Sequence, residues 1–255
     1  MITQVSCRKM VVFSDLHLGN PFSQVRRKTV RFIRWAVSQG YDICINGDGF
    51  DVAQVSLGRF TQDVPEVLQA LKEAVRCGSS VYYVVGNHDI VFEHFLFDWS
   101  GFKLAPFLNV RCGGARFRVE HGHLYDPFFV ASPRLYDLST WVGGLLLKVN
   151  PALYRMWIRF ERLKSRWLNI DGMPGIEGEP ASFYCSAAKI EARGFDGVVF
   201  GHTHHSGSAL LPLGGTYLNP GSWMLSSNFV RIEDGRAELL DFGSFEAAGG
   251  QQLVG

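Results

Sequence analysis

The sequence has no long apolar run and almost no net charge. Its nearest approach to a membrane helix, residues 141–147, is far shorter than the roughly 20 apolar residues that a membrane span requires. The first ten residues also lack the apolar centre of a signal peptide. The formal net charge is +1, which predicts no general attraction to nucleic acid. These absences predict a cytoplasmic protein with no nucleic-acid partner.

Cysteine is scarce as well. There are five cysteines, an odd number with no C-x-x-C pair, which argues against a disulfide framework or a thiolate zinc site. Cys44 and Cys185 have apolar sequence neighbours, so we expect both to be small buried thiols.

The first part of the chain alternates between strand and helix patterns. Apolar runs at residues 10–14, 41–46 and 81–85 predict buried strands, and each ends at a polar or glycine residue. Apolar spacing predicts helices over residues 25–38 and 65–76, the second with Pro65 in its first turn. Strand–helix–strand alternation of this kind predicts parallel strands in an α/β fold.

Later segments are dominated by short strands joined by glycine-rich turns. The residues 233–235, E-D-G, predict a hairpin between two of them, and residues 244–255 are rich in glycine and glutamine, which predicts a frayed tail. The expected core is thus two sheets flanked by helices, formed by residues 1–126 and 182–243. The predicted later strands are residues 110–112, 117–120, 197–200, 217–219, 229–232 and 237–240.

Residues 127–181 differ from this core and predict a helical cap inserted into it. Residues 151–168 place apolar side chains on one helical stripe, and residues 134–147 are a second, glycine-weakened helix candidate. Four arginines recur on another stripe of the first helix. They are either a solvated helix face or a basic surface for an anionic substrate or acidic lipid headgroups. These arginines are Arg155, Arg159, Arg162 and Arg166.

Five short polar motifs follow predicted strands in order along the chain. They are D-L-H (15–17), G-D-G-F-D (47–51), G-N-H-D (86–89), H-G (121–122) and G-H-T-H (201–204). Carboxylates and neutral imidazoles bind divalent metals, and one carboxylate can bridge two cations through its two oxygens. A single motif of this kind could be an ordinary polar turn, but five in order predict a metal site with Asp48 as the bridging ligand.

These motifs resemble those of the calcineurin-like metallophosphoesterases, D-x-H, G-D-x-x-D, G-N-H-D/E, H-G and G-H-x-H, over about residues 11–223. The resemblance implies an α/β two-sheet sandwich flanked by helices and two divalent cations, for which the mixed nitrogen and oxygen donors favour Mn²⁺, with Fe or Zn²⁺ as alternatives. By this resemblance Asp48 would join one metal to the ligands Asp15, His17 and His204, and the other to the ligands Asn87, His121 and His202.

The same resemblance implies hydrolysis of a phosphoester by a hydroxide generated on the metals. His88 would face the phosphoryl group as catalytic acid or charge stabiliser, with Asp89 orienting its ring. Asp51 would support a ligand histidine. His123 is expected to line the substrate pocket.

Two other histidines are not expected to bind metal. His205 should point away from the site, because neighbours on an extended segment face opposite sides. His94 lies among phenylalanines and is expected to be a packed residue.

The position of the cap resembles the branch that includes the UDP-2,3-diacylglucosamine hydrolases, although those commonly carry arginine where this chain has His88. A lipidated diphosphate would then contact Asn87, His88, His123, Arg155 and Arg159, and the cap would touch the inner face of the membrane. A generalist nucleotide phosphodiesterase or phosphomonoesterase is the alternative enzyme. The alternative from another class is a non-catalytic scaffold. Such a scaffold is expected to lack a metal ligand, but all the expected ligand residues are present in the motifs.

Overall fold

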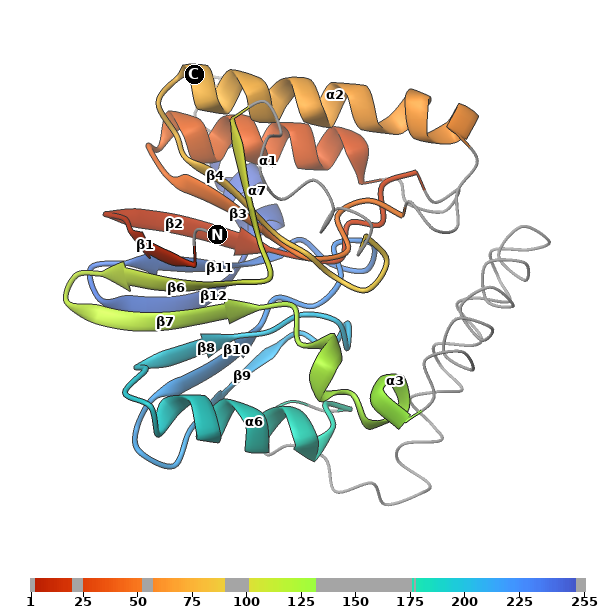
Figure 1. Ribbon diagram of the computed structural model, residues 1–255. Coiled ribbons are helices and arrows are strands. Elements are labelled where there is room, and N and C mark those ends of the chain that lie inside the picture. Colours follow the sequence, from red (N-terminus) through yellow and green to blue (C-terminus); the bar gives the residue numbers. More distant parts are fainter. Residues whose placement is uncertain are drawn as a thin grey trace.

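Two six-stranded sheets pack face to face, with helices on both outer surfaces (Figure 1). The computed structural model describes residues 3–19, 25–51, 57–89, 101–131, 176 and 178–250. One sheet has the order β12 (Arg236–Asp241), β11 (Asn228–Glu233), β2 (Lys9–Phe13), β3 (Asp42–Asn46), β4 (Val81–Val84) and β5 (Phe102–Ala105). The other has the order β1 (Gln4–Ser6), β6 (Phe107–Cys112), β7 (Ala115–Glu120), β8 (Gly197–Val199), β10 (Thr216–Asn219) and β9 (Gly207–Leu210).

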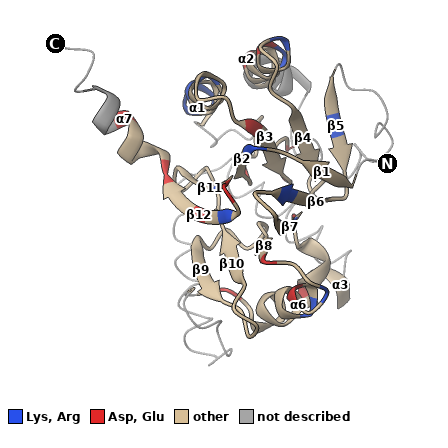
Figure 2. Ribbon diagram, turned by 90° about the vertical axis from the view of Figure 1, so that its left-hand side faces the viewer, with Lys and Arg blue, Asp and Glu red and all other residues tan. Residues whose placement is uncertain are grey.

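The layers follow from the alternation of side chains along the strands. On β2, Val11 and Phe13 face α1 (Arg26–Ser38) and α2 (Leu57–Arg76), while Met10 and Val12 face the other sheet. A third apolar cluster joins the outer face of the second sheet to α6 (Ala181–Glu191). Figure 2 shows α1 and α2 on one side of the paired sheets and α6 on the opposite side. The predicted α/β sandwich flanked by helices is confirmed.

The predicted parallel strands are confirmed. β2, β3 and β4 pair in parallel, with α1 and α2 as the crossovers. The hairpin at residues 233–235 is also confirmed: Glu233 pairs with Arg236, and Asp234 and Gly235 both have positive φ. The strands β1, β5 and β9 were not anticipated, because three or four residues are too few to give a clear strand pattern.

Helix α2 corrects the predicted position of Pro65. The helix begins at Leu57, so Pro65 lies inside it and not in its first turn. Proline removes one backbone hydrogen bond there. The buried Val64, Val67 and Leu71 pack this face of the helix onto the sheet, and such packing provides most of the stability of a helix in a protein.

The C-terminal segment corrects the predicted tail. Helix α7 (Phe242–Gly250) occupies residues expected to be frayed. Phe245 lies against the rings of Trp35 and Phe229, and Glu246 accepts a hydrogen bond from Nε of Arg31 at 2.6 Å. These contacts with α1 and β11 order a segment whose composition alone favours disorder.

Helix α6 also corrects one cysteine. Cys44 is buried as predicted, but Cys185 is exposed. The buried face of α6 carries Phe183, Ala187 and Ile190, so a side chain two positions after Phe183 points away from the sheet.

Most of the predicted cap, including its helices at 134–147 and 151–168, lies outside the described residues, as does His94. The short helix α3 (Pro127–Ala131) starts the segment. Ile176, which lies within the predicted cap, is buried in the cluster of α6. The division into core and cap otherwise stays a prediction. Among the described helices, none combines the length and the hydropathy needed to cross a bilayer.

The loops that follow the parallel strands meet at one edge of the sandwich. The loop after β2 is tied to the loop after β3, since the amides of Asp15 and His17 donate to the carbonyls of Gly47 (3.1 Å) and Asp48 (2.9 Å). In the other sheet, the amide of Gly201 after β8 donates to the carbonyl of His121 after β7, at 3.0 Å. The topology thus brings the ends of strands from both sheets together.

Candidate metal centre

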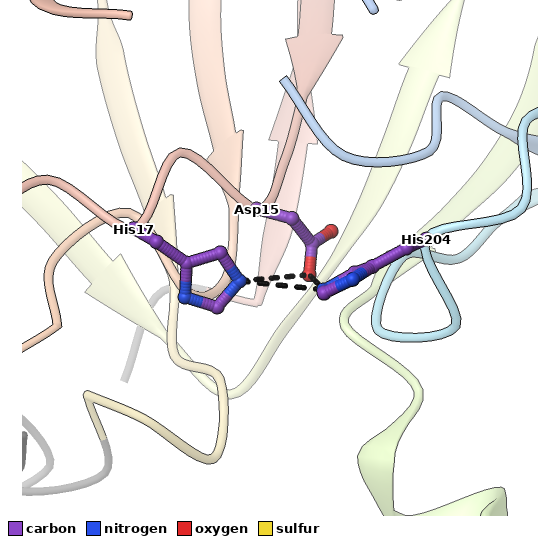
Figure 3. A group of neighbouring side chains, drawn as sticks. All are labelled: Asp15, His17 and His204. Carbon is purple, nitrogen blue, oxygen red and sulfur yellow. Dashed lines mark hydrogen bonds and ion pairs between the residues drawn. The ribbon is translucent and has the colours of Figure 1, made fainter. Parts of the chain in front are cut away.

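The first group of polar side chains consists of Asp15, His17 and His204 (Figure 3). Nε2 of His17 and Nε2 of His204 are 3.3 Å apart, and Oδ1 of Asp15 lies 3.2 Å from the latter and 3.9 Å from the former. Asp15 is fully buried, yet its Oδ1 has no hydrogen-bond donor of suitable geometry among the described residues. A buried carboxylate oxygen without a donor is costly, and a cation between these three atoms would satisfy it.

The spacing of these atoms suits a metal. Ligand atoms about 2.1 Å from a cation lie about 3.0–3.4 Å from one another in octahedral or tetrahedral geometry. Two of the three distances in this group fall within or near that range.

The second group consists of Asp48, His121 and His202, with Asn87 beside them. Nε2 of His121 lies 3.3 Å from Oδ2 of Asp48 and 3.2 Å from Oδ1 of Asn87. Nδ1 of His202 lies 3.0 Å from the same Asn87 oxygen. The other ring nitrogen of His121, Nδ1, is 2.9 Å from the carbonyl of Asn46, which leaves Nε2 as the nitrogen that faces the group.

A third group, His17, Asp48 and His88, joins the other two. His17 is shared with the first group and Asp48 with the second. Asp48 is 2 % exposed, and its two oxygens face different neighbours: Oδ1 accepts the backbone N–H of His88 at 2.9 Å, and Oδ2 faces His121. Asp48 thus lies where the second and third groups meet, and a carboxylate can join two cations.

The backbone is strained at the same residues. Among the described residues, six non-glycine residues have positive φ, and five of them belong to the ligand groups. Left-handed backbone is unfavourable for most side chains, so a concentration of it in one place points to a functional constraint. These five residues are Asp15 (φ 56°), His17 (45°), Asp48 (50°), His202 (69°) and His204 (62°).

Two glycines of the motifs are required by close approach. Gly47 has φ 79°, and a side chain there would overlap the ring of His121. A side chain at Gly86 would overlap the carboxylate of Asp48. The glycines of G-D-x-x-D and G-N-H-D therefore allow ligands from different strands to pack against the backbone.

His88 is oriented by Asp51 and not by Asp89, which corrects the expected pairing. Nδ1 of His88 lies 3.0 Å from Oδ1 of the fully buried Asp51. Asp89 is also fully buried, but it accepts hydrogen bonds from the backbone N–H groups of Gly49 (3.1 Å) and Gly86 (2.6 Å) and from the hydroxyl of Tyr83. Asp89 holds the two ligand-bearing loops in position.

Asp126 is a site residue that sequence reasoning missed. Its Oδ2 lies 3.0 Å from Nε2 of His202, the nitrogen opposite the one that faces Asn87. A carboxylate on the second ring nitrogen fixes the orientation of a metal-binding imidazole. The only available signal was the position of Asp126 five residues after His121, which by itself predicts no contact.

His123 and His205 belong to none of the three ligand groups. The ring of His123 lies 5.6 Å from that of His121 and packs edge-on against Phe129 at 5.3 Å. His205 lies against Gly178. Arg155 and Arg159 are outside the described residues.

The charges of the groups are interdependent. Burial alone would raise the pKa of Asp48, but the positive charges of His121 and His88 hold it well below its ordinary value. Burial likewise opposes protonation of His121, but Asp48 raises its pKa to about 10. Burial lowers the pKa of His17 to about 4, so this ring is neutral near pH 7. A divalent cation would compete with the protons on these rings, and the donor set of carboxylate, amide oxygen and imidazole fits such a cation.

The sandwich fold and the joined groups of aspartate and histidine define a metal-binding phosphoesterase scaffold. The sequence model for the calcineurin-like phosphoesterases matches residues 8–206, and the chain belongs to this family.

The chain is also similar to two characterised proteins. A UDP-2,3-diacylglucosamine hydrolase of Azotobacter vinelandii is 26% identical over 163 residues, which are 61% of this chain and 67% of that protein. The crystal structure of a dimetal phosphatase from Danio rerio has a TM-score of 0.52 at 11% identity, covering 91% of this chain and 95% of the other. The latter similarity shows the shared fold.

Proposed function

We propose that this chain is a phosphoesterase that uses two divalent cations, preferably Mn²⁺, to hydrolyse a phosphodiester or diphosphate bond. The observation that carries the proposal is that the ligand groups are linked: Asp48 is common to the group of His121 and the group of His88, and His17 is common to the latter and the group of Asp15. Asp15, His17 and His204 would hold one cation and Asn87, His121 and His202 the other. Bound cations would polarise the phosphoryl oxygens and lower the pKa of a bound water toward neutrality.

His88 is the residue best placed to move a proton. Asp51 holds its Nδ1, so its Nε2, 3.9 Å from Oδ2 of Asp48, faces the centre. Burial opposes protonation, but Asp48 and Asp51 raise the pKa of His88 to about 9. A protonated Nε2 can stabilise charge on the phosphoryl group or donate its proton to the leaving oxygen.

The substrate we favour is UDP-2,3-diacylglucosamine or a similar lipidated diphosphate. The curated relative carries that name. An apolar surface lies beside His123: Leu124 is 60% exposed and Val130 is 57% exposed. Exposed apolar side chains next to a polar site suit a ligand that joins acyl chains to a charged group. Asn87, His88 and His123 would contact the phosphoryl end.

A substrate screen tests the proposal. The protein is stripped of metal, reloaded with Mn²⁺ and assayed on bis-p-nitrophenyl phosphate, p-nitrophenyl phosphate and UDP-2,3-diacylglucosamine. We expect metal-dependent turnover, highest on the lipidated diphosphate. Preference for the small esters would favour the generalist phosphodiesterase or phosphomonoesterase, and the absence of turnover on all three would favour a non-catalytic scaffold.

The predicted arginine stripe is tested separately, since it would face the anionic substrate or the headgroups of the membrane. Changing its four arginines to glutamine should raise KM for the lipidated substrate and leave the small esters unaffected. The matched control changes the four arginines of helix α1. This helix packs on the outer face of the β2-containing sheet, away from the second sheet. Equal effects of the two sets would identify the stripe as a solvated face. The stripe comprises Arg155, Arg159, Arg162 and Arg166, and the control set Arg26, Arg27, Arg31 and Arg34.

A further inference from the structure

Glu179 is a fully buried carboxylate that contacts none of the proposed metal ligands directly. Its Oε1 accepts hydrogen bonds from the hydroxyl of Tyr217 and from Nδ2 of Asn219, the latter at 3.2 Å. Its Oε2 accepts the hydroxyl of Thr203. Burial raises the pKa of Glu179 to about 7, so keeping this acid in the interior is unfavourable unless its hydrogen bonds offset the cost.

One donor to Glu179, Thr203, belongs to the turn that carries two metal ligands, and the other two, Tyr217 and Asn219, lie on β10. Thr203 is the residue between His202 and His204. Asn219 extends the network, since its Nδ2 also lies 2.9 Å from Oγ1 of Thr203 and 3.2 Å from the carbonyl of Gly201. The carboxylate therefore sits at the centre of the contacts that hold residues 201–204.

This turn needs support from outside. His202 and His204 both have left-handed backbone, with φ of 69° and 62°, a conformation that persists only where surrounding contacts enforce it. Their rings serve different groups, His202 with Asp48 and His204 with Asp15. A small rotation of the turn would displace one ligand of each cation.

We propose that Glu179 is a positioning residue that fixes the G-H-T-H turn so that His202 and His204 reach their separate cations. This inference rests on the proposed two-metal function. It predicts that loss of Glu179 weakens both metal sites, although the side chain touches neither.

A second buried glutamate provides a matched control. Glu191 is 4% exposed and accepts the backbone N–H groups of Leu213 (3.1 Å) and Gly215 (2.6 Å). It holds a turn between β9 and β10 that contains no proposed ligand. Its loss should cost stability of the fold without changing metal affinity.

The experiment titrates Mn²⁺ into the metal-stripped full chain by calorimetry, for the wild type and the variants Glu179→Ala, Glu179→Gln and Glu191→Ala. We expect Glu179→Ala to lower the affinity of both sites by about 10- to 100-fold, the range for residues that orient metal ligands. Glutamine keeps an oxygen for Tyr217 and Asn219, and its amide can donate to the Thr203 oxygen, so Glu179→Gln should recover most of the affinity. Glu191→Ala should bind Mn²⁺ like the wild type.

The outcomes separate the two claims. Wild-type affinity in Glu179→Ala, or an equal loss in Glu191→Ala, would overturn the positioning role. A wild type that binds no Mn²⁺ would refute the proposed function itself. If Glu179→Ala does not fold, Thr203→Val tests the same link by removing only the hydroxyl, and unchanged Mn²⁺ affinity in that variant would also overturn the inference.

Discussion

Replacing Asp126 with alanine should weaken one metal site and leave the other intact. Oδ2 of Asp126 lies 3.0 Å from Nε2 of His202, and the carboxylate is 22% exposed. His202 belongs to the group of Asp48 and His121, whereas Asp15 and His204 belong to another group. The effect should therefore be confined to one of two cations.

The magnitude follows from the contact. A hydrogen bond that involves a charged group contributes about 1.5–3 kcal/mol, and about 1.4 kcal/mol corresponds to a factor of ten in affinity. Loss of Asp126 should thus cost about 10- to 100-fold in affinity at the His202 site, in agreement with the range for residues that orient metal-bound histidines.

Calorimetric titration of Mn²⁺ into the metal-stripped protein measures both sites at once. We expect one tight site as in the wild type and one weakened site. The control is Asp126→Asn, which keeps one oxygen that can accept from Nε2 of His202. Two sites of wild-type affinity in Asp126→Ala, or equal weakening of both, would refute the assignment of Asp126 to His202.

Three further predictions concern the centre. Chelation of metal, or Asp48→Ala, should abolish nearly all hydrolysis of bis-p-nitrophenyl phosphate, and near wild-type turnover in either case would contradict a two-metal site. His88→Ala should retain metal by elemental analysis and lose roughly 10²–10⁴-fold in kcat, the range for one positioned acid; an unchanged kcat would remove His88 from the chemistry. Burial raises the pKa of Glu179 from 4.5 to about 7. Between these two pH values the folded state holds a proton on Glu179 that the unfolded state has lost. The free energy of unfolding should therefore fall as pH rises through this window. Glu179→Gln should remove up to about 3 kcal/mol of that decline, measured by denaturant unfolding at pH 5 and 8, and an identical pH dependence in both proteins would contradict the raised pKa.

Several features of the fold were predictable because they depend on local pattern. Apolar runs identified β2, β3 and β4, and their parallel order follows from the helices between them. The place of Pro65 in its helix and the fraying of residues 244–250 were predicted incorrectly, because packing of the buried face of α2 and of Phe245 overrode the local rules for proline and glycine. Exposure of Cys185 depended on the face that α6 turns to the sheet.

The sequence by itself determined which side chains can bind metal, because their types and their places after strands are properties of short segments. Asp15, His17 and Asp48 are examples that the structure brings together. Only the tertiary structure decided the partners of those side chains. Asp51 and not Asp89 orients His88, Asp126 contacts His202, and Glu179 supports Thr203. Each pair joins segments far apart in the chain, and hydrogen bonds at about 3 Å depend on how strands and loops pack, which no local pattern encodes.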